Sequence, residues 1–273
     1  MTADAQPPIR AVVSDIDGTL LDPDKRLTPA AIAAVGRLHA AGVAFCLASS
    51  RPPAALATLI EQLSITAPCA AFNGGNIVSA DLQVLSAERL SAADARSVLD
   101  ELAARGLDAW LFSRGEWQIT RTDGDYIDLE TRTLGFGPRI LPRFEDLSSV
   151  DKIVSATRDT AALARAEGEL ATRFGGALTV MRSQTYYLDF SHRLANKGHA
   201  IHALAQTLGV PLNEVAALGD MPNDLPMLSA AGMSIAMGQA EAAVRAGVQF
   251  VTRSNREEGF AYALEHFILP RRA

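Results

Sequence analysis

The sequence predicts an α/β protein, with a doubly wound, Rossmann-like parallel sheet and a smaller α+β module inserted into it. Two observations lead to this prediction. Short apolar runs alternate with helical segments at both ends of the chain, which indicates a parallel sheet with right-handed crossovers. The middle instead pairs neighbouring strands and holds both tryptophans and all the tyrosines except Tyr262. We therefore expect a core formed by residues 1–83 and 189–273 and an inserted module, 84–188.

The N-terminal part of the core is predicted to hold three strands and two helices. Each strand is a short apolar run that ends in polar residues or glycine, as buried strands of a parallel sheet do. The first helix should begin after Thr28, an N-capping residue followed by Pro29, and should end at Gly42. The expected strands are 9–14, 43–48 and 69–72, and the second helix is 52–63.

The C-terminal part repeats this alternation, whereas the middle does not. Beyond residue 196 we expect helices 197–209, 223–231, 239–246 and 257–268 and strands 215–218, 233–237 and 249–252. In the middle we expect helices 92–105 and 160–174, strand pairs 108–112 with 117–120 and 178–181 with 186–190, and a strand 152–156. Pairs of neighbouring strands mixed with helices predict an α+β module.

Composition and charge exclude several functional classes. The chain has 273 residues, of which 48% are hydrophobic and 21% charged, as in folded globular domains. Its 25 basic and 31 acidic side chains give a net charge of −6 with no basic block, which argues against nucleic acid as a partner. The longest uncharged stretch, 62–80, is interrupted by Pro68 and by polar and glycine residues, so we expect no membrane-spanning segment.

Two further features bear on where the protein works. Cys46 and Cys69 each lie in an apolar run, and two cysteines cannot form a disulfide framework. Residues 1–10 contain no apolar stretch of signal-peptide length. We therefore expect a cytoplasmic protein whose cysteines are reduced.

Four polar clusters lie at the ends of predicted strands, where open α/β sheets bind their ligands. The first is Asp15-Ile16-Asp17-Gly18, directly after strand 9–14. Two carboxylates at the end of a buried strand are costly unless a cation or a proton separates them. A surface turn would also explain these four residues, but the preceding strand and the two leucines that follow favour a buried site.

The second cluster is Ser49-Ser50-Arg51, after strand 43–48. Hydroxyl groups and free backbone N–H groups at a helix start bind oxyanions, although plain N-capping also explains the serines. The third is Lys197, at the start of a predicted helix. A lone lysine is ordinarily a solvated surface residue, but a cation is disfavoured at a helix N-terminus, so this one calls for an anionic neighbour.

The fourth cluster is the run GDMPND at 219–224, after strand 215–218. Asp220 and Asp224 lie four positions apart, about one helical turn, so both can face one point. An ordinary capping aspartate is the alternative. The four clusters together supply carboxylates, a hydroxyl and an ammonium. A few hard oxygen ligands favour Mg²⁺, which keeps water and a substrate phosphate in its coordination shell.

These motifs, in this order, resemble those of the haloacid dehalogenase superfamily, and within it the Cof-type sugar-phosphate phosphatases with an inserted class IIB cap. The match spans nearly the whole chain, and residues 84–188 match in size and α/β pattern only. It rests on DIDGTL from Asp15, the cluster at Ser49, FNGG from Phe72, NKG from Asn196, GDMPNDLPML from Gly219, IAMGQA from Ile235 and VTRSNREEGFAYAL from Val251.

One motif departs from the family. The second motif usually reads Thr-Gly-Arg, whereas this chain has Ser49-Ser50-Arg51. Ser49 keeps the hydroxyl group that binds phosphate, and Ser50 stands where the family has glycine.

The resemblance implies a role for each motif residue. Asp15 would be the nucleophile that forms an aspartyl-phosphate, and Asp17 the general acid and then the general base. Mg²⁺ would be bound by Asp15, the backbone carbonyl of Asp17 and Asp220, with Asp224 in support. The phosphoryl oxygens would be held by the Ser49 hydroxyl, the Lys197 ammonium and the Asn223 side-chain amide. The backbone N–H groups of Ile16 and Asp17 would also bind them.

The sequence thus predicts Mg²⁺-dependent hydrolysis of a small phosphorylated metabolite, either a sugar phosphate or a phosphorylated cofactor. Two alternatives stay open. A phosphomutase or other phosphotransferase shares this fold but releases no free phosphate. A non-catalytic phosphoryl sensor would not need Asp17, because it has no leaving group to protonate. The motifs would contact the phosphate that all such esters share. The sequence therefore identifies neither the particular ester nor the oligomeric state.

Overall fold

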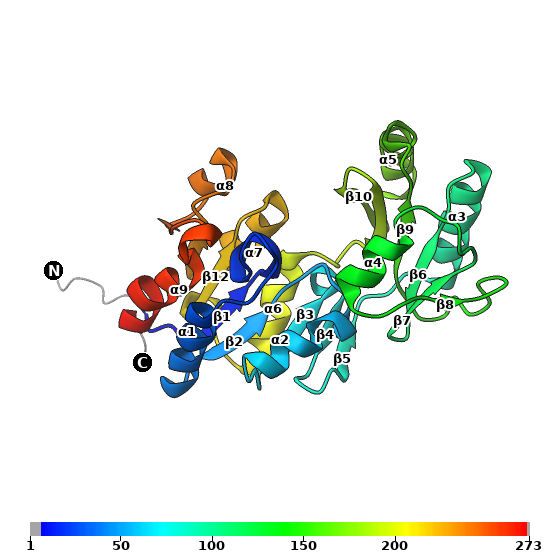
Figure 1. The fold of residues 1–273 in the computed structure, drawn as a ribbon. Helices are drawn as coiled ribbons and strands as arrows, with labels where there is room; N and C mark the ends of the chain where they lie inside the picture. Colours follow the sequence, from blue (N-terminus) through cyan, green and yellow to red (C-terminus); the bar gives the residue numbers. More distant parts are fainter. Residues whose placement is uncertain (1–6, 272–273) are drawn as a thin grey trace. The chain divides into compact units, whose positions relative to one another are not determined.

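The computed structural model describes residues 7–271, and the chain forms two compact units (Figure 1). The first unit contains the residues up to Ser50, Leu56–Ser86 and the residues from Asn196 onward. The second contains Arg51–Ala55 and Ala87–Ala195. The inserted module expected from the sequence is 84–188.

The first unit is built on a five-stranded parallel sheet, as predicted. Its strands are β1 (Ala11–Ser14), β2 (Ala44–Leu47), β12 (Val215–Gly219), β13 (Met233–Ala236) and β14 (Phe250–Val251), in the order β14-β13-β12-β1-β2. Every residue of β1 and β12 is buried. β1 pairs with both β2 and β12, and Ala11 is in register with Ala44 and Val215. The carboxyl ends of these three strands therefore lie next to one another.

The third predicted strand is present but belongs to a different sheet. β3 (Cys69–Ala71) pairs antiparallel with β4 (Asn76–Val78), and β5 (Val84–Ala87) completes a three-stranded sheet. A single parallel bridge between Ala48 and Ala70 links β3 to the end of β2. The chain reverses because Asn73 and Gly74 adopt positive φ angles of 58° and 97°, a conformation that these residue types tolerate.

The helices of the first unit are all present, several of them shorter than predicted. α1 begins as expected, where the Thr28 hydroxyl accepts the N–H of Ala31 at 3.2 Å. The predicted helices 52–63 and 223–231 begin with 3₁₀ turns that carry prolines, which donate no backbone hydrogen bond. The helices are α1 (Pro29–Ala40), α2 (Ala57–Gln62), α6 (Lys197–Leu208), α7 (Leu225–Ala230), α8 (Ala242–Ala246) and α9 (Gly259–Ala263).

The second unit contains a six-stranded sheet in the order β10-β11-β9-β6-β7-β8. Neighbouring strands are antiparallel except β7 and β8, which are parallel. The predicted α+β character of this part of the chain is confirmed. The strands are β6 (Trp110–Ser113), β7 (Glu116–Ile119), β8 (Arg139–Ile140), β9 (Val150–Ala156), β10 (Leu178–Gln184) and β11 (Tyr187–His192).

Two helices of the second unit share one apolar core with its sheet. Leu111, Ile153 and Phe190 are cross-strand neighbours on β6, β9 and β11. They are buried together with Val98 of α3 and Leu170 of α5, so both helices pack on the same sheet face. The helices of this unit are α3 (Ala92–Ala104), α4 (Ile127–Leu134) and α5 (Thr160–Phe174).

Sequence reasoning did not predict α4 or β8. α4 begins after Tyr126, whose φ of 64° is left-handed and which is not an N-capping residue type. The contacts that hold α4 are tertiary: the Tyr126 ring stacks on Tyr186 with centroids 4.3 Å apart, and the Tyr187 hydroxyl donates to Glu130 at 3.1 Å. β8 has two residues, both exposed. A strand of this length is too short to show an alternation of apolar and polar residues in the sequence.

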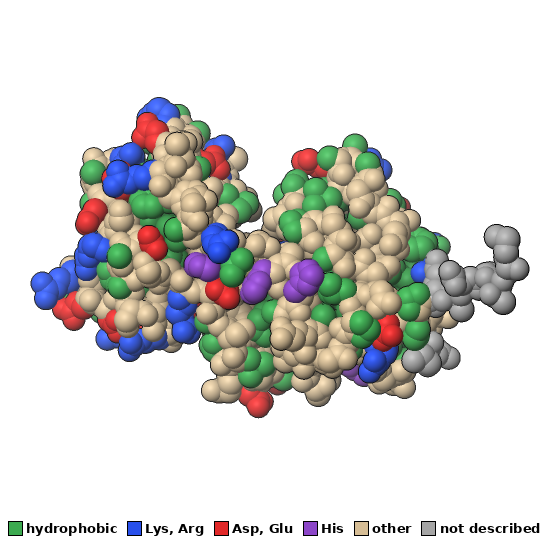
Figure 2. All heavy atoms as spheres, turned by 180° about the vertical axis from the view of Figure 1, so that it is seen from behind, with side chains coloured by type: hydrophobic (Ala, Val, Ile, Leu, Met, Phe, Trp, Pro, Cys, Tyr) green, Lys and Arg blue, Asp and Glu red, His purple; other side chains and the backbone are tan. Residues whose placement is uncertain are grey.

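The surface matches the mixed charge of the sequence. Figure 2 shows Lys and Arg side chains interspersed with Asp and Glu side chains on the face that it displays. Among residues 7–271, none of the helices combines the length and the apolar character needed to cross a bilayer. The expectation about a signal peptide concerns residues 1–10, of which the first six lie outside the described residues.

Candidate active site

The loop after β1 brings the first acidic motif to the carboxyl end of the sheet. Asp15 follows the strand, and residues Ile16–Leu20 form a tight turn. Gly18 has a φ of +94°, and a Cβ atom built on it would lie 2.3 Å from Asp220 Oδ2. Glycine is thus required here both by the backbone conformation and by the close approach. The turn allows the Thr19 hydroxyl to donate to Asp220 Oδ1 at 2.9 Å.

The loop after β12 carries the last acidic motif and is held by one of its own carboxylates. Asp224 Oδ2 accepts the backbone N–H groups of Asp220 and Met221, each at 2.9 Å. Asp224 is fully buried. It therefore fixes the backbone that presents Asp220.

Lys197 joins these two loops electrostatically. It is the first residue of α6, which the Asn196 side chain caps by accepting the N–H of His199 at 2.9 Å. The Lys197 ammonium donates to Asp15 Oδ1 and, at 2.6 Å, to Asp224 Oδ1. Only 2% of its side chain is exposed. Two carboxylates thus offset the unfavourable position of a cation at a helix N-terminus.

The site holds more buried negative charge than one ammonium can balance. Asp15, Asp220 and Asp224 each present a carboxylate oxygen, and these oxygens lie within 4.8 Å of one another. Burial raises the pKa of Asp15 to about 7; Lys197 acts to lower it, and Asp224 raises it further. Burial also raises the pKa of Asp220 to about 6. Asp15 and Asp224 keep the pKa of Lys197 above its ordinary value in spite of burial.

This donor set fits a divalent metal ion. Three carboxylates against one ammonium leave a surplus of negative charge in a buried place, which a hard cation would neutralise. Asp224 already uses Oδ1 for Lys197 and Oδ2 for two backbone N–H groups. Asp15 and Asp220 therefore have more carboxylate lone pairs available to coordinate a metal ion than Asp224 does.

Comparison with known proteins assigns this chain to a family. Residues 12–264 match the family of haloacid dehalogenase-like hydrolases. The chain belongs to this family. The resemblance read from the motifs is thereby confirmed.

This haloacid dehalogenase-like hydrolase has well-covered relatives. It is 30% identical over 231 residues to HMP-PP phosphatase of Cronobacter sakazakii, with 83% of each chain covered. It is 25% identical to 5-amino-6-(5-phospho-D-ribitylamino)uracil phosphatase of Bacillus subtilis, over 95% of this chain and 98% of that one. A haloacid dehalogenase-like hydrolase structure from Bacteroides thetaiotaomicron matches with a TM-score of 0.87 and 26% identity, covering 94% of this chain and 98% of that one.

Two further predicted residues of this hydrolase, Ile16 and Asp17, lie in the turn directly after Asp15, and the charge of Asp17 acts to raise the pKa of Asp220. The Asp17 side chain is 39% exposed, and its Oδ1 lies 3.9 Å from Lys25 Nζ. The Ile16 side chain is fully buried.

Ser49 and Asn223 complete the predicted set. Ser49 is buried at the end of β2, where its carbonyl accepts the N–H of Asn73 at 2.7 Å. Asn223 lies in the 3₁₀ turn Pro222–Asp224 and is partly exposed.

Sequence reasoning missed the residues that hold the Asp15 loop in this hydrolase. Gln239 Nε2 donates to the Gly18 carbonyl at 2.6 Å, and Asn255 Nδ2 donates to the Leu21 carbonyl at 3.0 Å. Gln239 Oε1 also accepts the backbone N–H of Asn255 at 3.0 Å. Both residues follow core strands, β13 and β14, so the strand-end rule that located the four clusters could have found them.

Asn73 is a third residue without a predicted role. Its φ is 58°, and its buried Oδ1 has no hydrogen-bond partner in the described chain. Its only sequence signal is its place in the FNGG run after β3.

Proposed function

We propose that this protein is a Mg²⁺-dependent phosphatase that hydrolyses a small phosphorylated metabolite through an aspartyl-phosphate on Asp15. The observation that carries the proposal is the buried cluster in which Lys197 contacts Asp15 and Asp224 beside Asp220. Phosphoryl transfer consists largely of positioning and of stabilising charge on the transferred group. A carboxylate nucleophile, an ammonium and a metal site in one place supply both.

Each binding residue has a task in this scheme. Asp15, the Asp17 carbonyl and Asp220 would hold Mg²⁺, which would supply positive charge beside the phosphoryl oxygens. The hydroxyl of Ser49, the ammonium of Lys197 and the amide of Asn223 bind these oxygens, together with the backbone N–H groups of residues 16 and 17. Asp224 orients Lys197 and the backbone of Asp220 through the contacts already described.

The reaction proceeds in two displacements. An Asp15 carboxylate oxygen attacks phosphorus, the bond to the leaving-group oxygen breaks, and the protonated Asp17 carboxyl donates its proton to that oxygen. Asp17 then takes a proton from a water molecule as the water oxygen attacks phosphorus. The phosphorus–Asp15 bond breaks and phosphate leaves. Lys197 favours the ionised form of Asp15 that the first step requires.

The substrate class follows from relatives that act on different esters. Besides the two phosphatases already described, a pyridoxal phosphate phosphatase of Escherichia coli is 24% identical over 95% of this chain. Their named substrates are small phosphorylated compounds, and they differ from one another. The phosphate ester is therefore the common element, and the rest of the substrate has to be found by experiment.

A phosphate-release screen tests the proposal. Purified protein is assayed with sugar phosphates, nucleotides, pyridoxal phosphate and flavin mononucleotide, with Mg²⁺, with EDTA, and with Mg²⁺ restored. We expect phosphate release with Mg²⁺ only and, on acid quenching, phosphoryl label on the peptide that contains Asp15. Isomerisation without phosphate release would show a phosphomutase instead. Tight binding of a phosphate ester without turnover would show a sensor.

A further inference from the structure

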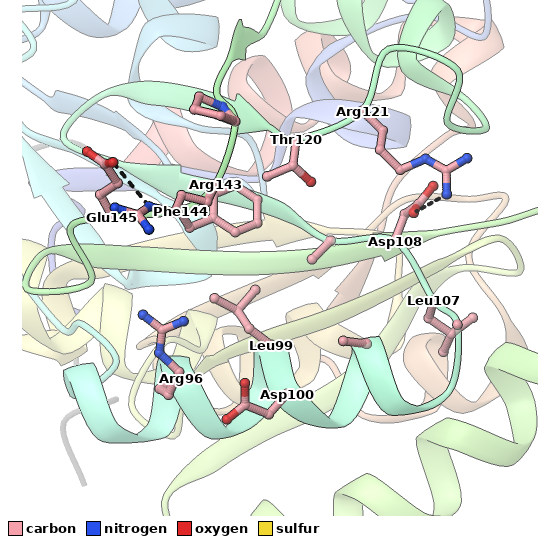
Figure 3. A pocket seen from close by; sticks show the side chains of 14 residues that line it. Arg96, Leu99, Asp100, Leu107, Asp108, Thr120, Arg121, Arg143, Phe144 and Glu145 are labelled. Carbon is pink, nitrogen blue, oxygen red and sulfur yellow. Dashed lines mark hydrogen bonds and ion pairs between the residues drawn. The ribbon is translucent and has the colours of Figure 1, made fainter.

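The second unit contains a cavity of about 700 Å³ that the proposed mechanism does not use (Figure 3). One wall is α3, and the other walls are formed by residues that follow α3, β7 and β8. The volume lies within the range of small-molecule sites in proteins. Every residue that lines it belongs to the second unit, so the cavity is a feature of that unit alone.

The base of the cavity is apolar. Leu99 and Ala103 of α3 line it together with Leu107 and Phe144. Leu99 is part of the buried core of the unit, and Leu107 and Phe144 pack against that core. A ligand with an aliphatic or aromatic body would remove apolar surface from water here on both sides of the contact.

The charged residues of the lining sum to zero, with three arginines and three acids. Four of them pair with each other. Arg121 Nη1 lies 3.6 Å from Asp108 Oδ1, and Arg143 Nε lies 3.3 Å from Glu145 Oε1. A lining of zero net charge attracts neither a net anion nor a net cation over a distance.

Arg96 and Asp100 are the two lining charges that remain. Both residues are exposed, and neither side chain makes an ion pair or hydrogen bond with another residue among 7–271. They lie four positions apart on α3 with the cation N-terminal, the less favourable order for an ion pair along a helix. Figure 3 shows Arg96 extending from α3 toward the side of the cavity that holds Arg143 and Phe144. The cavity thus offers one cation and one anion beside apolar surface.

We propose that this cavity binds a free α-amino acid with a large apolar side chain. Arg96 donates hydrogen bonds to the carboxylate, and Asp100 accepts them from the ammonium group. The apolar side chain of the ligand lies on Leu99 and Phe144. A ligand with only one of the two charges leaves Arg96 or Asp100 unmatched and binds more weakly.

The test measures binding by calorimetry with L-phenylalanine and with two derivatives that each lack one of its two charges. L-phenylalanine carries both charges, L-phenylalaninamide lacks the carboxylate, and N-acetyl-L-phenylalanine lacks the ammonium. We expect saturable binding of L-phenylalanine to the full-length protein, and binding at least about tenfold weaker for each of the other two, as for loss of a charge-assisted hydrogen bond. The readout needs no phosphatase activity, so it is independent of the proposed function.

Variants assign each charge to its residue. Arg96→Gln should weaken L-phenylalanine to the level of the amide, and Asp100→Asn should weaken it to the level of the N-acetyl compound. Ala103→Phe keeps both charges but fills the cavity, and it should abolish binding of all three probes. The matched control is Arg165→Gln, which removes an exposed arginine of α5 outside the cavity and should change nothing.

Three outcomes would overturn the proposal. The first is an absence of saturable L-phenylalanine binding to the folded protein. The second is equal affinity for all three probes, which would show an apolar pocket without charge recognition. The third is unchanged affinity in the Arg96 and Asp100 variants, which would place the ligand elsewhere. Circular dichroism of each variant confirms that a loss of binding is not a loss of fold.

Discussion

The decisive residues of the candidate site are buried charges whose pKa values depend on one another. Lys197 is stabilised as an ammonium by two carboxylates, and it in turn favours the ionised form of Asp15 against the effect of burial. Removing the Lys197 ammonium would leave its two carboxylate partners unpaired in a buried place, where breaking a buried ion pair costs about 3–5 kcal/mol. Substitutions that keep the shape of the side chain are therefore the informative ones.

Asp15→Asn should lower turnover by several orders of magnitude and leave the fold intact, because the amide is nearly isosteric but is not a nucleophile. The measurement is kcat together with thermal unfolding. If more than about a tenth of the activity remains, a loss of under ~1.4 kcal/mol in transition-state stabilisation, Asp15 is not the nucleophile. Asp24→Asn, an exposed aspartate of the same loop, is the control and should keep wild-type activity.

The loss of kcat caused by Asp17→Asn should depend on the leaving group of the substrate. An alkoxide needs a proton to leave, whereas an aryl phosphate releases a stable phenolate unaided. We expect a severe loss of kcat on an alkyl phosphate and a much smaller one on an aryl phosphate. Equal losses on both substrates would mean that Asp17 does not serve as the acid.

The sequence predicted which residues would meet because their positions follow a simple rule. Asp15 and Asp220 directly follow neighbouring parallel strands, and Lys197 at a helix start called for an anion, so their convergence could be expected. Their catalytic roles stay predictions. The same rule could have placed Gln239 and Asn255 at this edge of the sheet. It does not predict the backbone carbonyls to which they donate, because such a contact leaves no periodic signal in the sequence.

At the scale of elements, the turn Ile16–Leu20 depends on groups from two other strand ends. Its carbonyl at Gly18 is held by a side chain beyond β13, and its Thr19 hydroxyl reaches the loop after β12. The turn is thus fixed by tertiary contacts and by a glycine conformation, with little support from local propensity.

Gly18→Ala should weaken both folding and metal binding. The added Cβ meets Asp220 and the positive φ is strained, so we expect a loss of about 1–3 kcal/mol in the free energy of unfolding. We also expect weaker Mg²⁺ binding by calorimetry. The control is Gly36→Ala within α1, where a Cβ meets nothing within 4 Å. That change should be neutral or stabilising by up to about 1 kcal/mol. Equal effects of the two substitutions would contradict this account of the turn.

Element prediction succeeded where segments were long and failed where they were short. The expected helix 160–174 coincides with α5, because four turns display a clear apolar period. β4, with three residues, and β8, with two, offer no such pattern. The prediction that β3 belongs to the parallel sheet was wrong for a related reason. The reversal depends on positive φ angles at Phe72, Asn73 and Gly74, which an Asn-Gly pair permits but does not impose.

At the scale of the whole molecule, the residues predicted to bind phosphate belong to the first compact unit, and the inserted residues from Ala87 onward belong to the second. We expect residues 84–188 to select the leaving group, since the core motifs address the phosphate alone. Replacing this segment by that of a relative with a different substrate should change the order of preference among esters. The Mg²⁺ dependence should stay the same. The check is the ratio of kcat/KM values over an ester panel, and a preference that stays with the core would refute it.

The order of strands in the first sheet also has a consequence for how the protein folds. β1 pairs with β2 soon after it in the chain, but its other neighbour, β12, is more than 200 residues away, since Ala11 pairs with Val215. A ribosome therefore releases Asp15 long before Lys197 and Asp220 are synthesised, and the inserted unit is made in between. Because such distant pairing is slow, refolding should restore helix signal first and the metal site last.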